Sequence, residues 1–229
     1  MRRLVLAPAL ALALLAPHAG AAPAPQVTDP SGDANFTANV NHEATRDNTT
    51  VPLTQAYADV TSVLWQTTKT TKKVKGKTVT TVTGFTVTTT LSGPPTPPDP
   101  TALVYRMLGT TPKCGIFGVV YYTNPGSDDQ IPQSALRDDC IDETIRLTAI
   151  PAPVIKDNTI TWTVPMSAIP ADSGVKAGTK ITDLWFEVRE LQDYNTCTPD
   201  DTPELGRTCG AANGVVDNSA KDGDSFTLA

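Results

Sequence analysis

Acidic and amide side chains gather near the start of the chain, in the stretch VTDPSGDAN (27–35). Asp29, Asp33 and Asn35 lie around Gly32, whose backbone freedom permits a sharp bend. Calcium takes roughly six to eight oxygen ligands from carboxylates, amides and carbonyls. The stretch therefore predicts a calcium site. An Asp-capped turn uses the same residue types and stays open as the alternative.

A second acidic cluster, DNSAKDGDS (217–225), lies close to the end of the chain. If the first and last strands of the fold are neighbours, both clusters contribute to one site, and Asp59 joins them from an adjacent strand. A hairpin turn at KDGD is the simpler alternative, because Asp and Gly are ordinary turn residues. The predicted metal ligands are Asp29, Asp33, Asn35, Asp59, Asp222 and Asp224.

The three tryptophans are candidates for stacking on a sugar ring. Trp162 alternates with Ile160 and Val164, which indicates a core position. Trp185 alternates with the apolar row that starts at Leu184, so it is predicted to face outward and to contact a ligand. Trp65 lies in a strand without clean alternation and is the second candidate for ligand binding.

Catalytic chemistry has few residues to use. His42 is the only histidine after residue 21, and the stretch HEATR around it lacks the second histidine of a zinc-protease helix. The acidic residues lie in turn-like sequences without the apolar surroundings that raise a carboxyl pKa for acid catalysis. We therefore expect a non-catalytic protein, with a hydrolase as the alternative.

The first 21 residues have the layout of a secretory signal peptide, with Arg2 and Arg3 before an apolar run. We expect this segment to be removed, a short leader at 22–26, and a single domain from 27 to 229 in a secreted protein. Removing the two arginines leaves 16 basic and 24 acidic residues, a net charge of −8. This acidity argues against nucleic acid as a partner. The sequence after residue 21 contains no second long apolar run, so we expect no membrane span.

Four cysteines remain, an even number that favours two disulfides in an exported protein. Three pairings are possible. Pairing in sequence order is favoured, because each bridge then closes one polar loop: Cys114 with Cys140, and Cys197 with Cys209.

Short segments that alternate between apolar residues and threonine run through the chain and predict antiparallel strands. In 78–92, Phe85, Val87 and Leu91 share one face. Further strands are expected at 59–67, 101–108, 115–122, 143–150, 152–165, 181–191 and 224–229, a helical turn at 166–171, and loops at 34–58 and 123–140. The expected fold is an all-β, two-layer antiparallel β-sandwich, such as an immunoglobulin-like one, with about eight to ten strands.

Five lysines between residues 69 and 77 stand out on an acidic chain. They either form the solvated tip of a hairpin, where charge discourages edge-to-edge pairing, or meet an anionic surface such as the cell envelope.

Three stretches, DPSGDAN (29–35), ADVTSV (58–63) and ITWTVPMSAIP with GVKAGTKITDL (160–184), resemble a group of exported actinobacterial β-sandwich proteins with a DPxGD start. That group is similar to DOMON-like sandwiches and to the module appended to some glucodextranases. The resemblance implies a ligand-binding or surface-binding sandwich, with carbohydrate as the ligand class. A structural, envelope-associated protein without a small-molecule site is the alternative.

Overall fold

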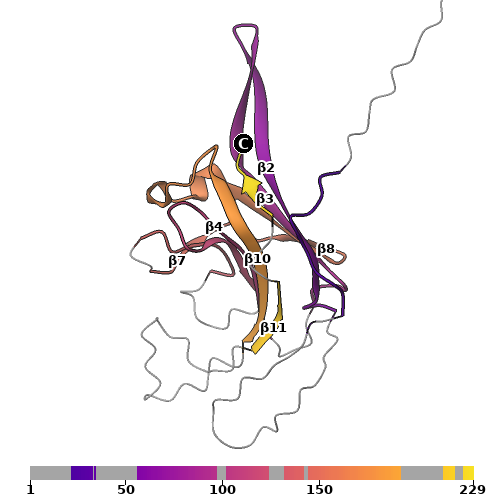
Figure 1. Cartoon of the computed structure of the whole chain (residues 1–229). Helices are drawn as coiled ribbons and strands as arrows, with labels where there is room; N and C mark the ends of the chain where they lie inside the picture. Colours follow the sequence, from indigo (N-terminus) through magenta and orange to yellow (C-terminus); the bar gives the residue numbers. More distant parts are fainter. Residues whose placement is uncertain are drawn as a thin grey trace, which may run out of the picture.

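The computed structural model describes residues 22–32, 34, 56–96, 102–123, 132–141, 144–191, 214–219 and 224–229. Within these ranges the chain forms twelve strands and two short 3-10 turns. All strand pairs are antiparallel, and they make two sheets, as the sequence predicts. Figure 1 shows the arrangement.

The first sheet has the strand order β1-β2-β3-β9-β8. Its strands are β1 (Val27–Thr28), β2 (Val60–Val74), β3 (Lys77–Leu91), β9 (Thr159–Pro165) and β8 (Val154–Lys156).

The second sheet has the order β11-β10-β4-β5-β6-β7, and the short β12 pairs with the start of β10. Its strands are β11 (Gly214–Asn218), β10 (Lys180–Leu191), β4 (Ala102–Thr110), β5 (Phe117–Tyr122), β6 (Ser134–Asp138), β7 (Arg146–Ala149) and β12 (Phe226–Thr227).

The apolar core draws on alternate residues of both sheets, because successive side chains of a strand point to opposite faces. The row of Ile160, Trp162 and Val164 is fully buried, which confirms the inward face predicted for that hairpin. The predicted row of Phe85, Val87 and Leu91 is buried as well. Leu184, Phe186 and Val188 form the corresponding row of β10.

Aromatic contacts tie the end of the chain into this core. The ring of Trp65 stacks on Phe85, with 5.6 Å between centroids, and contacts Phe226 of β12 at 5.9 Å. Phe85 also contacts Phe117 of the second sheet at 6.2 Å. The predicted last strand is therefore confirmed, and one aromatic ring of it packs against the first sheet.

Three strands, β1, β6 and β11, lie where the sequence did not predict a strand, and β1 begins the stretch that was expected to form the acidic turn. β6 falls inside the predicted loop 123–140, because SALRD contains one large apolar residue, Leu136, too few to show alternation. β11 was not predicted either, since VVDN carries only two valines. The described chain thus has more strands than the expected eight to ten, and the predicted helical turn is the 3-10 turn Met166–Ala168.

Cys114 and Cys140 form a disulfide, which confirms the first predicted pairing. Cys197 and Cys209 lie outside the described residues, so the second pairing stays a prediction.

No helix among the described residues is long and apolar enough to cross a membrane.

Candidate functional site

The outer face of the second sheet carries a row of arginines that points away from the core. On β4, Leu103, Tyr105 and Met107 belong to the core, so Arg106 points outward. The same alternation sends Arg137 outward on β6, where Leu136 is the core residue. On β10, Trp185 and Glu187 lie between the core residues Leu184, Phe186 and Val188 and therefore share the outer face.

Strand register brings these side chains together. Glu187 pairs with Arg106 across β10 and β4. One row further along, Trp185 pairs with Leu108, Leu108 with Gly118, and Gly118 with Arg137. Cross-strand neighbours on one face interact directly, so β10, β4, β5 and β6 build one continuous site.

Two hollows open on this face, and Ile116 and Arg137 line both of them. The first, of about 520 Å³, lies over β10 and β4. The second, of about 620 Å³, lies beside the disulfide. We call the two together the arginine groove. Its other described lining residues include Arg106, Leu108, Trp185, Glu187, Arg189, Lys113, Asp139 and Ile145.

Cations outnumber anions in the groove. Glu187 lies between two arginines: its carboxylate is 3.5 Å from Arg106 Nη1 and forms an ion pair with Arg189. Arg106 is only 18% exposed and Glu187 14%. In the hollow that Trp185 lines, the described residues include three arginines, Arg106, Arg137 and Arg189, against the carboxylate of Glu187, which leaves a net positive charge there.

Arg137 has no salt bridge within the described residues. Its Nε is buried without a hydrogen-bond partner in the described part of the chain, and the same holds for Nε of Arg106. Burial, and then the charge of Arg106, lower the pKa of Arg137 below the usual arginine value. An N–H that is buried without an acceptor is costly. The rest of the guanidinium is partly exposed in the groove, where a carboxylate or another anion can form charge-assisted hydrogen bonds with it.

Gly118 keeps the groove open between Leu108 and Arg137. A Cβ at this position would lie 2.0 Å from the backbone oxygen of Met107, so the close approach of β5 and β4 requires glycine. Because Gly118 has no side chain, nothing fills the row between its two neighbours.

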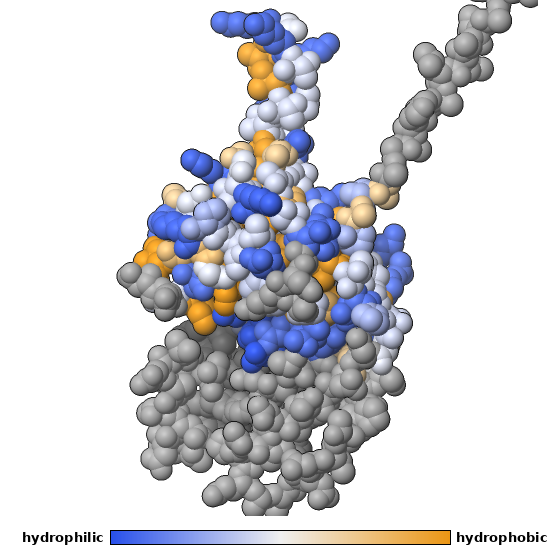
Figure 2. Space-filling view, viewed as in Figure 1, coloured by the Kyte–Doolittle hydropathy of each residue, from blue (hydrophilic) through white to orange (hydrophobic). Residues whose placement is uncertain are grey.

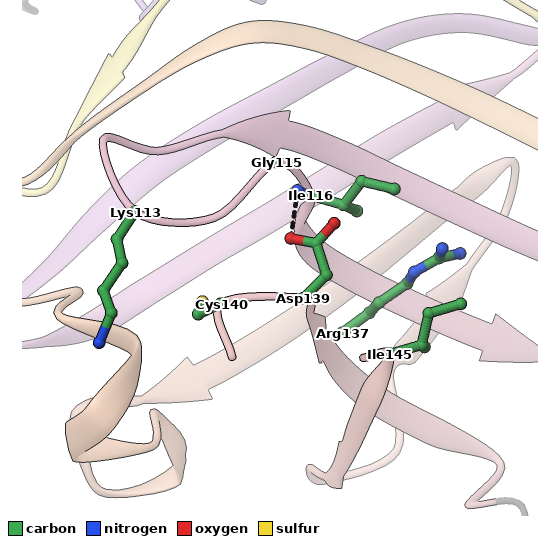
Figure 3. Close-up of a pocket in the computed structure, with 7 residues that line it drawn as sticks. All are labelled: Lys113, Gly115, Ile116, Arg137, Asp139, Cys140 and Ile145. Carbon is green, nitrogen blue, oxygen red and sulfur yellow. Dashed lines mark hydrogen bonds between the residues drawn. The ribbon is translucent and has the colours of Figure 1, made fainter. Parts of the chain in front are cut away.

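The connection between β4 and β5 forms one wall of the groove, shown in Figure 3. The disulfide fixes this wall to the end of β6. Asp139 Oδ1 accepts a hydrogen bond of 2.6 Å from the Ile116 backbone N–H. These two links hold Arg137 and the wall in one arrangement, which favours binding because little has to be ordered when a ligand arrives.

The arginines of the groove were not predicted as site residues. The available pattern was an arginine at an outward position of the otherwise apolar strand LVYRML, while SALRD offered only Arg137 next to the single large apolar residue Leu136. The second of these strands was itself missed. Without the pairing of β4, β5 and β6, nothing in the sequence places Arg106 near Arg137.

Of the two tryptophans predicted to bind a ligand, the structure brings one to the groove. Trp185 lines it on the face opposite the Leu184 row, as predicted, but it is buried and not open to solvent, with 6% of its surface exposed. Trp65 is 1% exposed in the core and presents no ring face to solvent.

The predicted metal ligands are partly brought together. Asp59 is buried, and its Oδ2 accepts a 2.7 Å hydrogen bond from Gly32 N–H in the DPSG turn. Asp59 Oδ1 has no hydrogen-bond partner within the described residues. Next to it, Asp217 Oδ2 accepts a 2.7 Å bond from Val60 N–H and so links β11 of the second sheet to β2 of the first.

Asp29 and Asp224 lie further along β1 and β2. Asp29 donates its N–H to Thr61, whereas Asp224 donates to Gln26. Gln26 is bonded at the level of Val63, roughly 13 Å along an extended strand from Asp59. Asp224 therefore does not lie beside Asp59.

Asp33, Asn35 and Asp222 lie outside the described residues, as does His42. In the ranges that the structure describes, no three His, Cys, Asp or Glu side chains form a group that could hold a metal ion. Calcium binding at the DPSGD turn stays a prediction.

Comparisons with protein-family models, with curated proteins and with solved structures found no match for this chain. The resemblance to DOMON-like sandwiches therefore stays a prediction.

Proposed function

We propose that this chain is a secreted, non-catalytic β-sandwich protein that binds a carboxylate-bearing ligand, an acidic saccharide, in the arginine groove. The observation that carries the proposal is Arg137, a largely buried guanidinium without a salt bridge in the described structure, whose Nε–H is unused. Guanidinium and carboxylate groups match in geometry and form charge-assisted hydrogen bonds.

The surroundings of Arg137 support a sugar acid over a simple anion. Trp185 and Leu108 supply apolar surface next to the cations, as pockets for small organic ligands generally do. Glu187 is an acceptor for sugar hydroxyl groups, held in place by Arg106 and Arg189. The combination of cation, acceptor and apolar wall suits a ring that carries both hydroxyl groups and a carboxylate.

Binding of oligogalacturonate, measured by isothermal titration calorimetry, tests the proposal, with a neutral gluco-oligosaccharide of equal length as the ligand control. We expect Arg137→Gln to weaken oligogalacturonate binding roughly 10- to 150-fold, since hydrogen bonds to charged groups contribute about 1.5–3 kcal/mol. Lys156→Gln removes the same charge from an exposed position on β8 and serves as the matched control.

Equal binding of the neutral and acidic oligosaccharides would contradict the assignment of an anionic ligand. Equal loss in Lys156→Gln and Arg137→Gln would show that overall charge, and not the groove, is responsible. Trp185→Phe is expected to weaken binding of the saccharide but not of free citrate, because citrate has no ring to pack on the indole.

A further inference from the structure

The β2–β3 hairpin extends well beyond the sandwich, as Figure 1 shows. β9 pairs with β3 only from Gly84 to Thr90, and β1 pairs with β2 only at Ser62 and Val63. Past these points the two strands pair only with each other among the described strands. We call residues 69–82 the hairpin arm. Every residue from 69 to 81 is exposed.

The arm is a regular ribbon although, among its residues, only Val82 at its base packs against the core. The turn at its tip has positive φ at Lys75 (49°) and Gly76 (78°), the conformation that joins two strands tightly. Thr71 and Thr80 share a hydrogen bond across it. A two-stranded ribbon has little stability by itself in water. The arm therefore enlarges the exposed surface of the protein and contributes little to its core.

The outer end of the arm combines exposed valines with lysines. Directly paired residues share a face, so Lys72 lies beside Val79, and Val74 beside Lys77. Val74 is 51% exposed and Val79 45%. Figure 2 shows hydrophobic atoms on the arm directly behind its strongly hydrophilic tip.

The charge of the arm is opposite to that of the rest of the chain. The segment 60–92 contains five lysines and no acidic residue, while the whole chain has a net charge of −6, which leaves −11 for the remaining residues. Lys73 lies on the face opposite Lys72, and Lys75 is at the turn, so cations surround the tip.

The presence of lysines on both faces of the arm and at its turn indicates which kind of partner can contact all of them. A groove on another protein, or a polymer lying along one face, would contact only the lysines of that face. A flat anionic surface met by the tip contacts all four outer lysines together. Lysines gain from anionic lipid headgroups, and apolar side chains gain from the acyl boundary just beneath them.

We propose that the hairpin arm docks tip-first on an anionic lipid bilayer, with Lys75, Lys77 and Val74 entering the headgroup region first and Lys72, Lys73 and Val79 following behind them. The contact is peripheral. It is independent of the arginine groove, which lies on the outer face of the second sheet.

Co-sedimentation of the full chain with lipid vesicles tests this. We expect binding to phosphatidylcholine vesicles that contain phosphatidylglycerol, no binding to pure phosphatidylcholine, and loss of binding at high salt. The variant Lys72→Gln/Lys75→Gln/Lys77→Gln should bind about 100-fold more weakly, at about fivefold for each lysine. The control Lys156→Gln/Lys176→Gln/Lys180→Gln makes the same charge change away from the arm and should bind like the parent protein.

A variant without the two valines distinguishes a membrane from other anionic partners. Val74→Ser/Val79→Ser should weaken vesicle binding about tenfold, at about 25 cal/mol per Å² of apolar surface withdrawn from water, and leave binding to soluble polyphosphate unchanged. If the valine variant binds vesicles as strongly as the parent protein, and polyphosphate is bound equally well, the proposal would be overturned in favour of an anionic polymer. Arm-dependent dimers without vesicles would overturn it in favour of a second copy of the chain. Unchanged melting temperatures would exclude misfolding as the cause.

Discussion

Replacing Arg137 by methionine should stabilise the protein without ligand and abolish its response to ligand. The guanidinium is largely buried, has no salt bridge in the described structure and leaves its Nε–H without an acceptor. A buried unsatisfied polar group costs about 1–3 kcal/mol. Methionine keeps a chain of similar length and removes both this cost and the repulsion from Arg106.

The attraction of Glu187 and Asp139 for Arg137 offsets part of the gain. We therefore expect Arg137→Met to raise the free energy of unfolding by about 1–2 kcal/mol. For a chain of this size the melting temperature would rise by about 2–8 °C. Thermal unfolding followed by circular dichroism measures it.

Ligand should reverse the order of stability of the parent protein and the Arg137→Met variant. At an oligogalacturonate concentration about 100 times its Kd, the parent protein gains about 2.7 kcal/mol, whereas the variant gains little. The parent protein should then melt at the higher temperature. A variant that is less stable than its parent without ligand would refute the argument that Arg137 is unsatisfied. A variant that keeps the full ligand-induced shift would refute the assignment of the groove.

Three further outcomes follow from the described contacts. Changing Cys114 and Cys140 to serine removes a bridge between residues 26 apart in sequence; urea unfolding should show a loss of about 3 kcal/mol, and an unchanged midpoint would mean that the bridge does not form. Asp217→Ala leaves the buried Val60 N–H without its acceptor and should cost about 1–3 kcal/mol in urea, more than Asp217→Asn, which keeps an oxygen. Burial raises the pKa of Tyr105 in the folded protein, so the unfolded state ionises first: stability should be complete below about pH 10 and fall above it by up to about 1.4 kcal/mol per pH unit. Urea titrations at alkaline pH measure this slope, and it should be smaller in Tyr105→Phe.

The alternation of threonine with large apolar residues was sufficient to predict much of the fold. Ile160, Trp162 and Val164 are buried because a strand sends every second side chain to one face, whatever its partners. The same rule predicted that Trp185 leaves the core. Alternation did not predict β6, because Leu136 is the only large apolar residue on the inner face of that strand.

The sequence by itself determined composition, charge and the periodicity of individual strands, because these are local properties of neighbouring residues. It could therefore show that five lysines gather at one hairpin and that Cys114 and Cys140 can close one loop. Only the tertiary structure decided which strands are neighbours. Arg106 and Arg137 are 31 positions apart in sequence and line one groove because β4 and β6 both pair with β5. Strand order depends on contacts between distant residues, and no local pattern encodes them.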